Sequence, residues 1–283
     1  MPELPEIETV KLQLQPVLTG QTLESVELIS HKSVQGHLDG FIRHSVEQVR
    51  RKAKVLLIDF NGGLTMAFHF KMTGQLVYII GNKRIAGGHP TEDFVGQLPS
   101  NHTRLILKFP KGTLYFNDQR LFGWVKVGKT SEIEAEKFFQ GLGPEPFNIN
   151  VSEFITRVTK SKRPIKLVLM DQMVISGVGN IYANDALWEA KVNPQTPSNK
   201  LQEGQLKLLL EKIKLVLREG IKYGGATAAD AKYIDLHGLG GHYQDHFRTY
   251  DRTGKNCLRN DGGIIKKFVL GGRGTYYCPK CQV

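Results

Sequence analysis

The sequence opens with MPELPEIETVKLQLQPVLTG (1–20), and the pattern in this stretch sets the start of the fold. Its apolar residues recur three or four positions apart, at Ile7, Val10, Leu14, Val17 and Leu18. That spacing predicts a helix that begins near Pro5, buries one apolar stripe and ends at Gly20. Proline and carboxylates are typical of a first helical turn, so MPELPE has an ordinary structural explanation as well as a functional one.

Short β-rich runs follow between residues 22 and 128, separated by turn residues such as Asn61-Gly62-Gly63. The runs are VLLIDF (55–60), LTMAFHF (64–70), QLVYII (75–80), TRLILKF (103–109) and TLYF (113–116). Several antiparallel strands at this spacing predict a sandwich or barrel. Residues 84–101, rich in Gly, Pro, His and polar side chains, are predicted to form a mobile loop.

The second half of the chain changes character after GLGPEPFN (141–148), a Gly/Pro stretch that marks a boundary. Helical patterns follow, and QLKLLLEKIKLVLREGIKYG (205–224) carries a core-facing apolar stripe. The tail, residues 247–283, is too short to bury a core of its own and needs a covalent or metal link. The sequence therefore predicts an α+β protein, with an N-terminal helix and a β-sandwich or barrel followed by a helical region and a small C-terminal hairpin.

The net charge of +11, from 38 Lys and Arg against 27 Asp and Glu, favours a polyanionic partner, and nucleic acid is the leading candidate. A basic but inert surface is the alternative. A membrane surface is less favoured, because no basic amphipathic helix is apparent and no stretch has the length of a membrane span. The first twenty residues lack the apolar core of a secretory signal.

The three cysteines all lie within the last 27 residues, which suggests a metal site in a reducing compartment. Cys278 and Cys281 have the spacing at which two thiolates share one metal, and Cys257 lies upstream across a predicted hairpin. Tetrahedral zinc needs a fourth ligand, for which Asp261 is preferred. Asn260, a distant histidine or water are alternatives, as is a hairpin without zinc.

Two further stretches suit a phosphate backbone. GVGN (177–180) predicts a tight turn before a helix, whose N–H groups can face an anion and whose Asn180 could cap the helix. Taken on its own, this stretch is better explained by a plain turn between helices. Arg50, Arg51, Lys52 and Lys54 precede an apolar strand, where they could meet phosphates or form a solvated loop.

The residue after the initial methionine can be a nucleophile. Removal of Met1 would expose Pro2 as a secondary amine, and an α-amino group has a reference pKa of about 7.7–8.0. A helix N-terminus lowers such a pKa further. A neutral amine can attack an aldehyde or a sugar C1′ to form a Schiff base, with Glu3 positioned to move protons. Retention of Met1 would block this chemistry.

Seven stretches, in this order, resemble the signatures of one family, the bacterial formamidopyrimidine-DNA glycosylases, over essentially the whole chain. They are MPELPE (1–6), FHFKMTG (68–74), NDQRLFGW (117–124), GLGPEP (141–146), SGVGNIYANDALW (176–188), GGATAAD (224–230) and GGRGTYYCPKCQ (271–282). Leu4 favours the purine-repair branch, because the related endonuclease VIII group usually has glycine there.

The resemblance implies roles for individual residues. Pro2 matches the nucleophile, Glu3 the acid–base group, and Lys54 a lysine that contacts DNA beside the lesion and aids catalysis. Asn180 and Arg273 match the pair that grips the phosphates flanking the everted nucleotide, and Arg273 also serves the elimination step. The remaining DNA-binding matches are Met72, Arg120 and Phe122, which fill the space of the flipped base, and His102 and Lys162, which touch the backbone.

The sequence departs from the family pattern in three places. The second zinc cysteine is absent, so that Asn260 or Asp261 stands in for it. Leu121 occupies a position where a second arginine is common. The lesion-capping loop lacks its usual proline near Gly240, in HGLGGH (237–242). The last two changes could remove a DNA contact and alter lesion preference.

The resemblance implies a base-excision-repair glycosylase and AP lyase that removes oxidised purines from double-stranded DNA and also acts at abasic sites. It implies a catalytic β-sandwich at 1–130, a linker at 131–150, a helix–two-turns–helix domain at 151–246 and a zinc-finger-like hairpin at 247–283. One zinc, with ligands Cys257, Asp261, Cys278 and Cys281, a monomer, no membrane and a cytoplasmic location complete the expectation. An oxidised-pyrimidine glycosylase and a non-catalytic damaged-DNA binding module are the alternatives.

Overall fold

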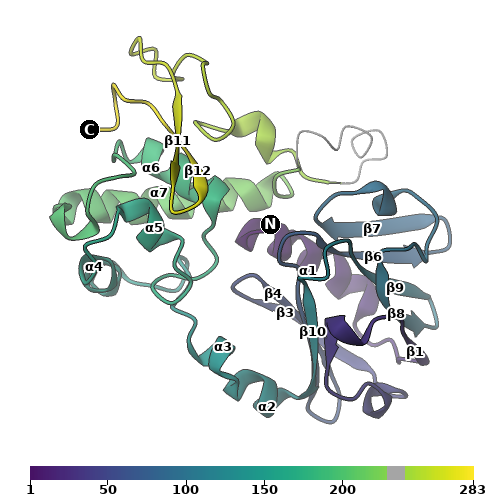
Figure 1. Ribbon diagram of the computed structural model, residues 1–283. Coiled ribbons are helices and arrows are strands. Elements are labelled where there is room, and N and C mark those ends of the chain that lie inside the picture. The colour runs from purple at the N-terminus through teal and green to yellow at the C-terminus, as the bar shows by residue number, and fades with distance from the viewer. Residues whose placement is uncertain (228–239) are drawn as a thin grey trace. The chain divides into compact units, whose positions relative to one another are not determined.

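The computed structural model describes residues 1–227 and 240–283 (Figure 1). It divides into two compact units, each made of two segments of the chain. The first unit comprises Met1–Gln140 and Tyr223–Gln244, and the second comprises Gly141–Lys222 and Asp245–Val283. In the described part of the chain, no helix combines the length and the apolarity that crossing a membrane requires.

The first unit is the predicted β-sandwich with its N-terminal helix, α1 (Leu4–Leu18). One sheet has the order β1 (Ser25–Leu28), β8 (Thr103–Phe109), β9 (Gly112–Asp118), β6 (Gly74–Ile80) and β7 (Lys83–Gly88). The other has the order β2 (Val34–Gln35), β10 (Trp124–Lys129), β5 (Leu64–His69), β4 (Val55–Phe60) and β3 (Val46–Lys52). Neighbouring strands are antiparallel apart from β2 and β10, which are parallel.

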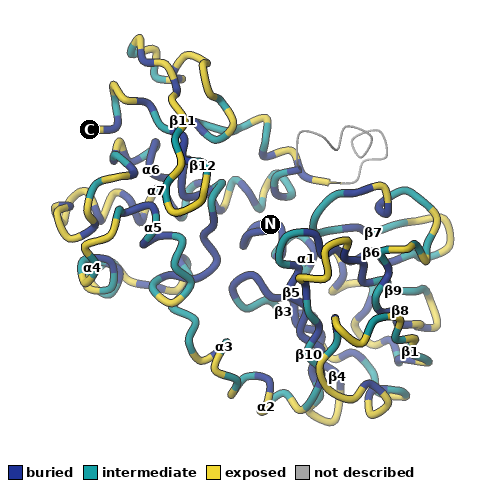
Figure 2. The backbone as a smooth tube through the Cα atoms, in the orientation of Figure 1, coloured by how far each residue is buried: buried dark blue, intermediate teal, exposed yellow. Residues whose placement is uncertain are grey.

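The apolar stripe of α1 packs into the core that the two sheets share. Ile7, Val10, Leu14 and Leu18 are at most 2% exposed and join side chains from both sheets in one cluster. Figure 2 shows the same pattern, since the inner strands β4, β5 and β6 are mostly buried and most of the exposed segments, in yellow, lie in turns. The helix prediction is confirmed, although the helix ends two residues before Gly20.

The prediction of a mobile loop over residues 84–101 is wrong. Residues 83–88 form β7, which pairs with β6, and η3 (Glu92–Phe94) follows. Phe94 packs with Val77 and Ala86 in a small separate cluster. A Cβ at Gly87 would overlap the side chain of Val10, so this glycine allows α1 to pack closely on the strand.

Two short helices, α2 (Thr130–Ala135) and α3 (Lys137–Gln140), end the first segment of this unit. Among the described residues, the short 3-10 helices besides η3 are η1 (His31–Ser33), η2 (Asp39–Phe41), η4 (Ser198–Lys200) and η5 (Tyr243–His246).

The second unit is helical, as predicted, and carries the C-terminal hairpin. Its helices are α4 (Val151–Thr159), α5 (Ile165–Leu169), α6 (Asn180–Glu189) and α7 (Glu203–Lys222), and its hairpin pairs β11 (Lys266–Leu270) with β12 (Arg273–Tyr277). The tail does not fold on its own core. Its apolar residues Cys257, Ile265, Tyr276 and Cys278 instead cluster around Trp188 of α6.

Candidate active site and metal centre

The N-terminal residues are buried and anchored at the start of α1. Pro2 is buried and Glu3 is 2% exposed. The Glu6 carboxylate accepts a hydrogen bond from the Glu3 N–H (2.7 Å) and another from the Ala226 N–H (2.8 Å). The Glu6 carboxylate thus links the N-terminus of α1 to the second segment of this unit. This link fixes the backbone next to Pro2.

Lys54 lies in the turn between β3 and β4, next to Ala53, whose φ is +53°. It is 5% exposed, an unusual position for a lysine. On β5, His69 pairs with Val55, the residue after Lys54. Burial, and then the charges of Lys71 and Lys54, lower the pKa of His69 to about 3. The imidazole is therefore neutral at pH 7, and its Nδ1 accepts the Lys71 N–H at 3.0 Å.

Two of the four basic residues just before β4 form ion pairs with carboxylates of the same unit. Arg50 forms ion pairs with Asp59 and Glu134, and Arg51 pairs with Glu8 at 2.7 Å. These two arginines hold the sandwich together, so the prediction that they suit a phosphate backbone finds no support in their contacts.

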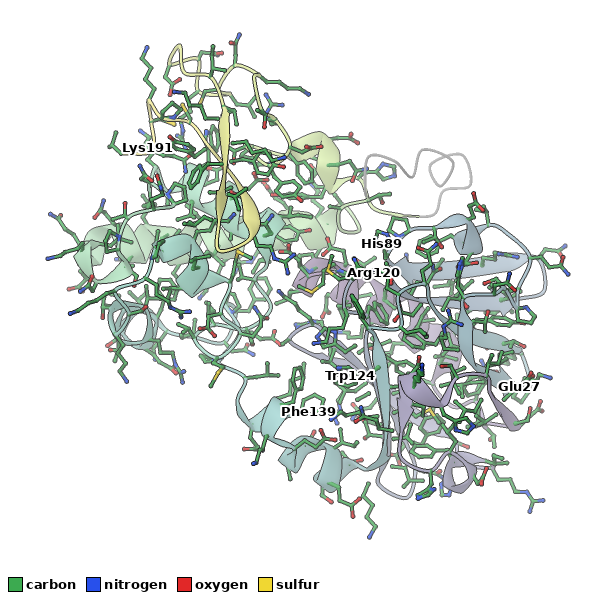
Figure 3. All side chains as sticks on the ribbon, viewed as in Figure 1. Glu27, His89, Arg120, Trp124, Phe139 and Lys191 are labelled. Atoms are coloured by element: carbon green, nitrogen blue, oxygen red, sulfur yellow. The ribbon has the colours of Figure 1, made fainter. Side chains whose placement is uncertain are left out.

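Two turns carry the three side chains expected to fill the space of a flipped base. Met72 is half-buried in the turn before β6, while Arg120 and Phe122 are exposed in the turn between β9 and β10. The Arg120 guanidinium lies 4.6 Å from the centre of the Phe122 ring. Leu121, between them, has a φ of +56°, a left-handed conformation that few non-glycine residues adopt. Arg120, in this turn, and Trp124, the first residue of β10, are labelled in Figure 3.

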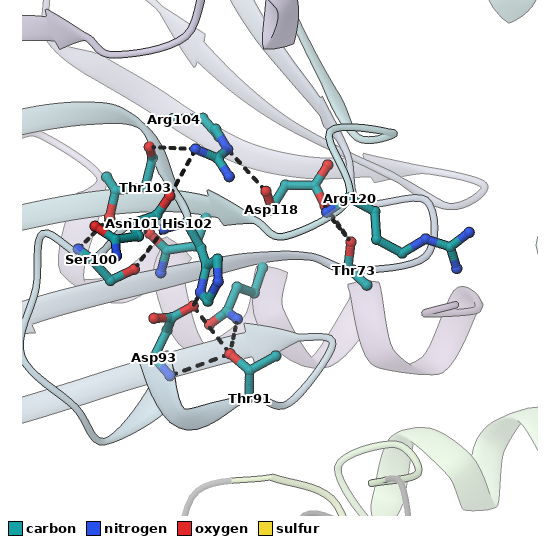
Figure 4. A network of polar contacts seen from close by, with 12 residues as sticks. Thr73, Thr91, Asp93, Ser100, Asn101, His102, Thr103, Arg104, Asp118 and Arg120 are labelled. Carbon is teal, nitrogen blue, oxygen red and sulfur yellow. Dashed lines mark hydrogen bonds and ion pairs between the residues drawn. The ribbon is translucent and has the colours of Figure 1, made fainter.

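Asp118 ties these two turns together, as Figure 4 shows. Its carboxylate is fully buried and accepts hydrogen bonds from the Thr73 hydroxyl, the Gly123 N–H (2.7 Å) and the Arg120 N–H (3.3 Å). Thr73 Oγ1 also accepts the Arg120 N–H at 3.1 Å. The guanidinium of Arg120 extends away from this network (Figure 4). Asp118 therefore fixes the turn backbone and leaves the Arg120 side chain outside it.

His102 lies at the other end of the same network. Its Nδ1 is 2.9 Å from a carboxylate oxygen of Asp93, and its side chain remains 39% exposed. Thr91 bonds Asp93 and in turn accepts from the Gln75 side chain at 2.6 Å. This contact fixes the orientation of the imidazole and leaves Nε2 as the ring nitrogen without a partner among these contacts.

In the second unit, Lys162 is exposed between α4 and α5, and Asn180 is the first residue of α6. Asn180 does not cap the helix as predicted: the N-cap is Gly179, which has no side chain to do so. The Asn180 Oδ1 is buried and accepts no hydrogen bond from the described residues.

Arg273 is exposed at the start of β12, opposite Leu270. The next two residues are anchored by Lys166, a fully buried lysine on α5. Its Nζ donates to the Gly274 carbonyl (2.8 Å) and to the Thr275 hydroxyl (2.7 Å). The hairpin is thus fixed to the helical part of the unit directly beside Arg273.

The four residues predicted to hold zinc come together. One ligand atom from each of Cys257, Asp261, Cys278 and Cys281 lies within 4.8 Å of the others. The Cys257 and Cys281 sulfurs are 3.9 Å apart, and an Asp261 oxygen is 3.6 Å from the Cys278 sulfur. Asn260 forms a turn, in which its N–H donates to the Cys257 carbonyl. Asp261 is favoured as the fourth ligand because its carboxylate lies among the three sulfurs.

The surroundings of this cluster fit a cation. A Cβ at Gly263 would collide with the Cys278 sulfur, and the Gly263 N–H donates to Asp261 at 2.7 Å. That hydrogen bond lowers the pKa of Asp261, so the carboxylate is ionised at neutral pH. Burial, followed by the neighbouring Cys278 and Cys257, raises the pKa of the Cys281 thiol. A divalent cation would relieve this crowding by binding the thiolates.

Three models of protein domains match this chain in order. The formamidopyrimidine-DNA glycosylase N-terminal domain matches residues 1–125, its H2TH domain matches 142–232, and the zinc finger found in FPG and IleRS matches 262–283. The chain belongs to the formamidopyrimidine-DNA glycosylase family. The family resemblance stated from the sequence is thereby confirmed, as is its α+β architecture.

Full-length relatives agree with this assignment. The formamidopyrimidine-DNA glycosylase of Pelotomaculum thermopropionicum is 37% identical, with 100% of this chain and 99% of the relative covered. A Lactococcus lactis Fpg bound to abasic-site DNA superposes with a TM-score of 0.85 at 28% identity, covering 100% of both chains. The same enzyme bound to a DNA with an oxidised pyrimidine gives 0.85 at 28% identity, with 99% of each chain covered.

Several residues of this site were not predicted from the sequence. Glu6 could have been found, because a carboxylate three residues after the N-cap position is a capping-box signal. Asp118 and Lys166 gave no local signal, since each acts on segments distant in the sequence. The departure noted near Gly240 concerns residues 237–242, of which 237–239 lie outside the described part of the chain.

Proposed function

We propose that this chain is a bifunctional DNA glycosylase and AP lyase. It excises oxidised purines, 8-oxoguanine and formamidopyrimidines, from double-stranded DNA and then cleaves the strand at the abasic site. The observation that carries the proposal is the anchored start of α1, where Glu6 holds the backbone beside the buried Pro2 and Glu3. Family membership over the whole chain supports it.

Pro2 is the proposed nucleophile, after removal of Met1. Its secondary amine attacks C1′ of the damaged nucleotide, the bond to the base breaks, and an iminium forms. Glu3 exchanges protons with the sugar during ring opening. Loss of a C2′ proton expels the 3′ phosphate, and a second elimination expels the 5′ phosphate. Lys54 is proposed to contact the DNA beside the lesion and to aid catalysis, and Arg273 is proposed to serve the elimination step.

DNA binding is assigned to residues of both units. Met72, Arg120 and Phe122 occupy the space left by the everted nucleotide, which offsets part of the lost stacking. His102, Lys162 and Asn180 contact phosphates. The firm backbone contacts of Asp118 and the outward guanidinium of Arg120 support this assignment, because a side chain that replaces a base must be both fixed and accessible.

Zinc would be held by Cys257, Asp261, Cys278 and Cys281, which fit one ion. When bound, it supplies a structural cross-link and no chemistry of the reaction. This cross-link would hold the C-terminal hairpin, and Arg273 is the first residue of its strand β12. The domain boundaries at 130, 150 and 246, a monomeric state and a cytoplasmic location belong to the same proposal.

Borohydride trapping tests the proposal. The protein is mixed with a duplex containing 8-oxoguanine opposite cytosine, reduced, and analysed by peptide mass mapping. We expect a covalent adduct on Pro2. A matched control carries three extra residues before Met1, which block the amine while the fold is kept. Tight binding of the unblocked protein without an adduct would instead support a non-catalytic damaged-DNA binding module.

A preference for oxidised pyrimidines is the second candidate, and one structural neighbour was solved with a DNA of that kind. Leu4 argues against it, as the endonuclease VIII group usually has glycine there. Rates of release of thymine glycol and 8-oxoguanine from matched duplexes separate the two. Faster release of thymine glycol would overturn the purine assignment and leave the Pro2 chemistry intact.

A further inference from the structure

Trp188, near the end of α6, makes a polar contact with one of the four metal-site residues. Its indole Nε1 lies 3.3 Å from the Cys257 sulfur. Both side chains are buried, at 6% and 1% exposure. An indole N–H can only donate, so the sulfur is the acceptor.

Arg259 fixes this indole from its other side. The guanidinium lies over the Trp188 ring, 4.1 Å from the ring centre. It also donates to the backbone carbonyls of Trp188 (2.7 Å) and Glu189 (3.1 Å), where its positive charge suits the C-terminal end of a helix. Trp188 is therefore held between Cys257 and a residue two positions further along the same loop.

Ordinary core packing explains only part of this arrangement. Trp188 packs with Ile265 and Tyr276, but packing does not require its N–H to face a sulfur. A buried indole N–H needs an acceptor, and here the acceptor is a metal ligand. Three thiolates and one carboxylate carry more negative charge than one zinc ion neutralises. A hydrogen-bond donor to Cys257 and the positive charge of Arg259 lower the free-energy cost of this excess negative charge.

We propose that Trp188 is a positioning residue of the metal centre: its N–H orients the Cys257 sulfur as a ligand, and Arg259 holds the indole in place. This inference rests on the zinc site proposed above. It also links zinc to α6, because the helix that ends beside Cys257 begins with Asn180.

The test removes the N–H and keeps the ring. The chain has two tryptophans, so Trp124→Phe leaves Trp188 as the only one. In that background, benzothienylalanine replaces tryptophan at 188 with a ring of similar shape that has sulfur in place of N–H. We expect zinc affinity, measured by competition with a chelator, to fall about 10–100-fold. Trp124→Phe alone should bind zinc as the parent does.

Cobalt substitution gives a readout that packing alone would not change. A thiolate that loses a hydrogen bond is more electron-rich, so its charge-transfer band to Co²⁺ should move to longer wavelength. Unchanged zinc affinity together with an unchanged cobalt band would overturn the role of Trp188 and leave the zinc site standing. If the parent protein holds no zinc after purification and incubation with zinc, both the zinc site and the role of Trp188 are overturned.

Discussion

Replacing Asp118 by asparagine should loosen both turns that carry Met72, Arg120 and Phe122. The carboxylate receives donors on both oxygens: the Gly123 N–H on Oδ2, and the Thr73 hydroxyl and Arg120 N–H on Oδ1. An asparagine has only one acceptor oxygen, so in either orientation its NH₂ group faces a donor. At least one buried donor then loses its acceptor.

The structure sets the size of this effect. A hydrogen bond to a charged group contributes about 1.5–3 kcal/mol, and a buried unpaired donor costs about 1–3 kcal/mol. With partial relaxation, we expect a loss of about 2–4 kcal/mol in the free energy of unfolding, or roughly 5–15 °C in Tm. Ordering one looser turn residue on binding costs a further ~1–2 kcal/mol, so the Kd for an abasic-site duplex should rise about 5–30-fold.

Thermal unfolding followed by circular dichroism and fluorescence anisotropy with a labelled duplex measure the two quantities. Asp39→Asn is the matched control, because it is the same substitution at an exposed position. If Asp118→Asn unfolds within about 2 °C of this control, the carboxylate is not what fixes the turns, and the reasoning fails.

Three further changes test other parts of the structure. Glu6→Gln leaves one acceptor for two N–H donors, so borohydride trapping should slow about tenfold while the Kd for DNA changes little; an unchanged trapping rate would show that this anchor is dispensable. The pKa of His69 is lower in the folded protein than in the unfolded chain, so the stability it contributes is complete above pH 6.5 and is lost as pH falls toward 3. Urea unfolding should give about 2 kcal/mol less stability at pH 5 than at pH 7.5 from this residue, a difference that should vanish in His69→Gln. Asp261→Cys should hold zinc more tightly against a chelator, since a fourth thiolate is a softer ligand than a carboxylate; unchanged retention would place Asp261 outside the metal site.

The elements with strong periodicity could be predicted from the sequence. The apolar stripe of α1 and the short β-rich runs carry their own signal, because helices and strands bury residues at fixed intervals. The strand β7 could not be predicted, since Gly87 and Gly88 suggest a loop. Only the position of Val10 shows that a glycine is needed there for close packing.

The residues of the candidate site likewise differ in whether a local sequence pattern predicts them. Cys278 and Cys281 are close in sequence, and their spacing alone predicts a metal. The contacts that position functional residues join distant segments: Thr73 with Asp118 are 45 residues apart, and Lys166 with Thr275 are 109 apart. No local pattern encodes such pairs, because they exist only after the chain has folded.

The hydrogen bond between Glu6 and Ala226 spans 220 residues, and this separation has a consequence for biosynthesis. At about 5–20 residues per second, a ribosome needs roughly 10–45 s to make the intervening chain. During that interval the first residues lack their distant anchor, and closing so long a loop is among the later steps of folding. An aminopeptidase can therefore act on Met1 before this anchor forms. Under the proposed mechanism, the contact with Ala226 is then one of the later steps that place the amine of Pro2.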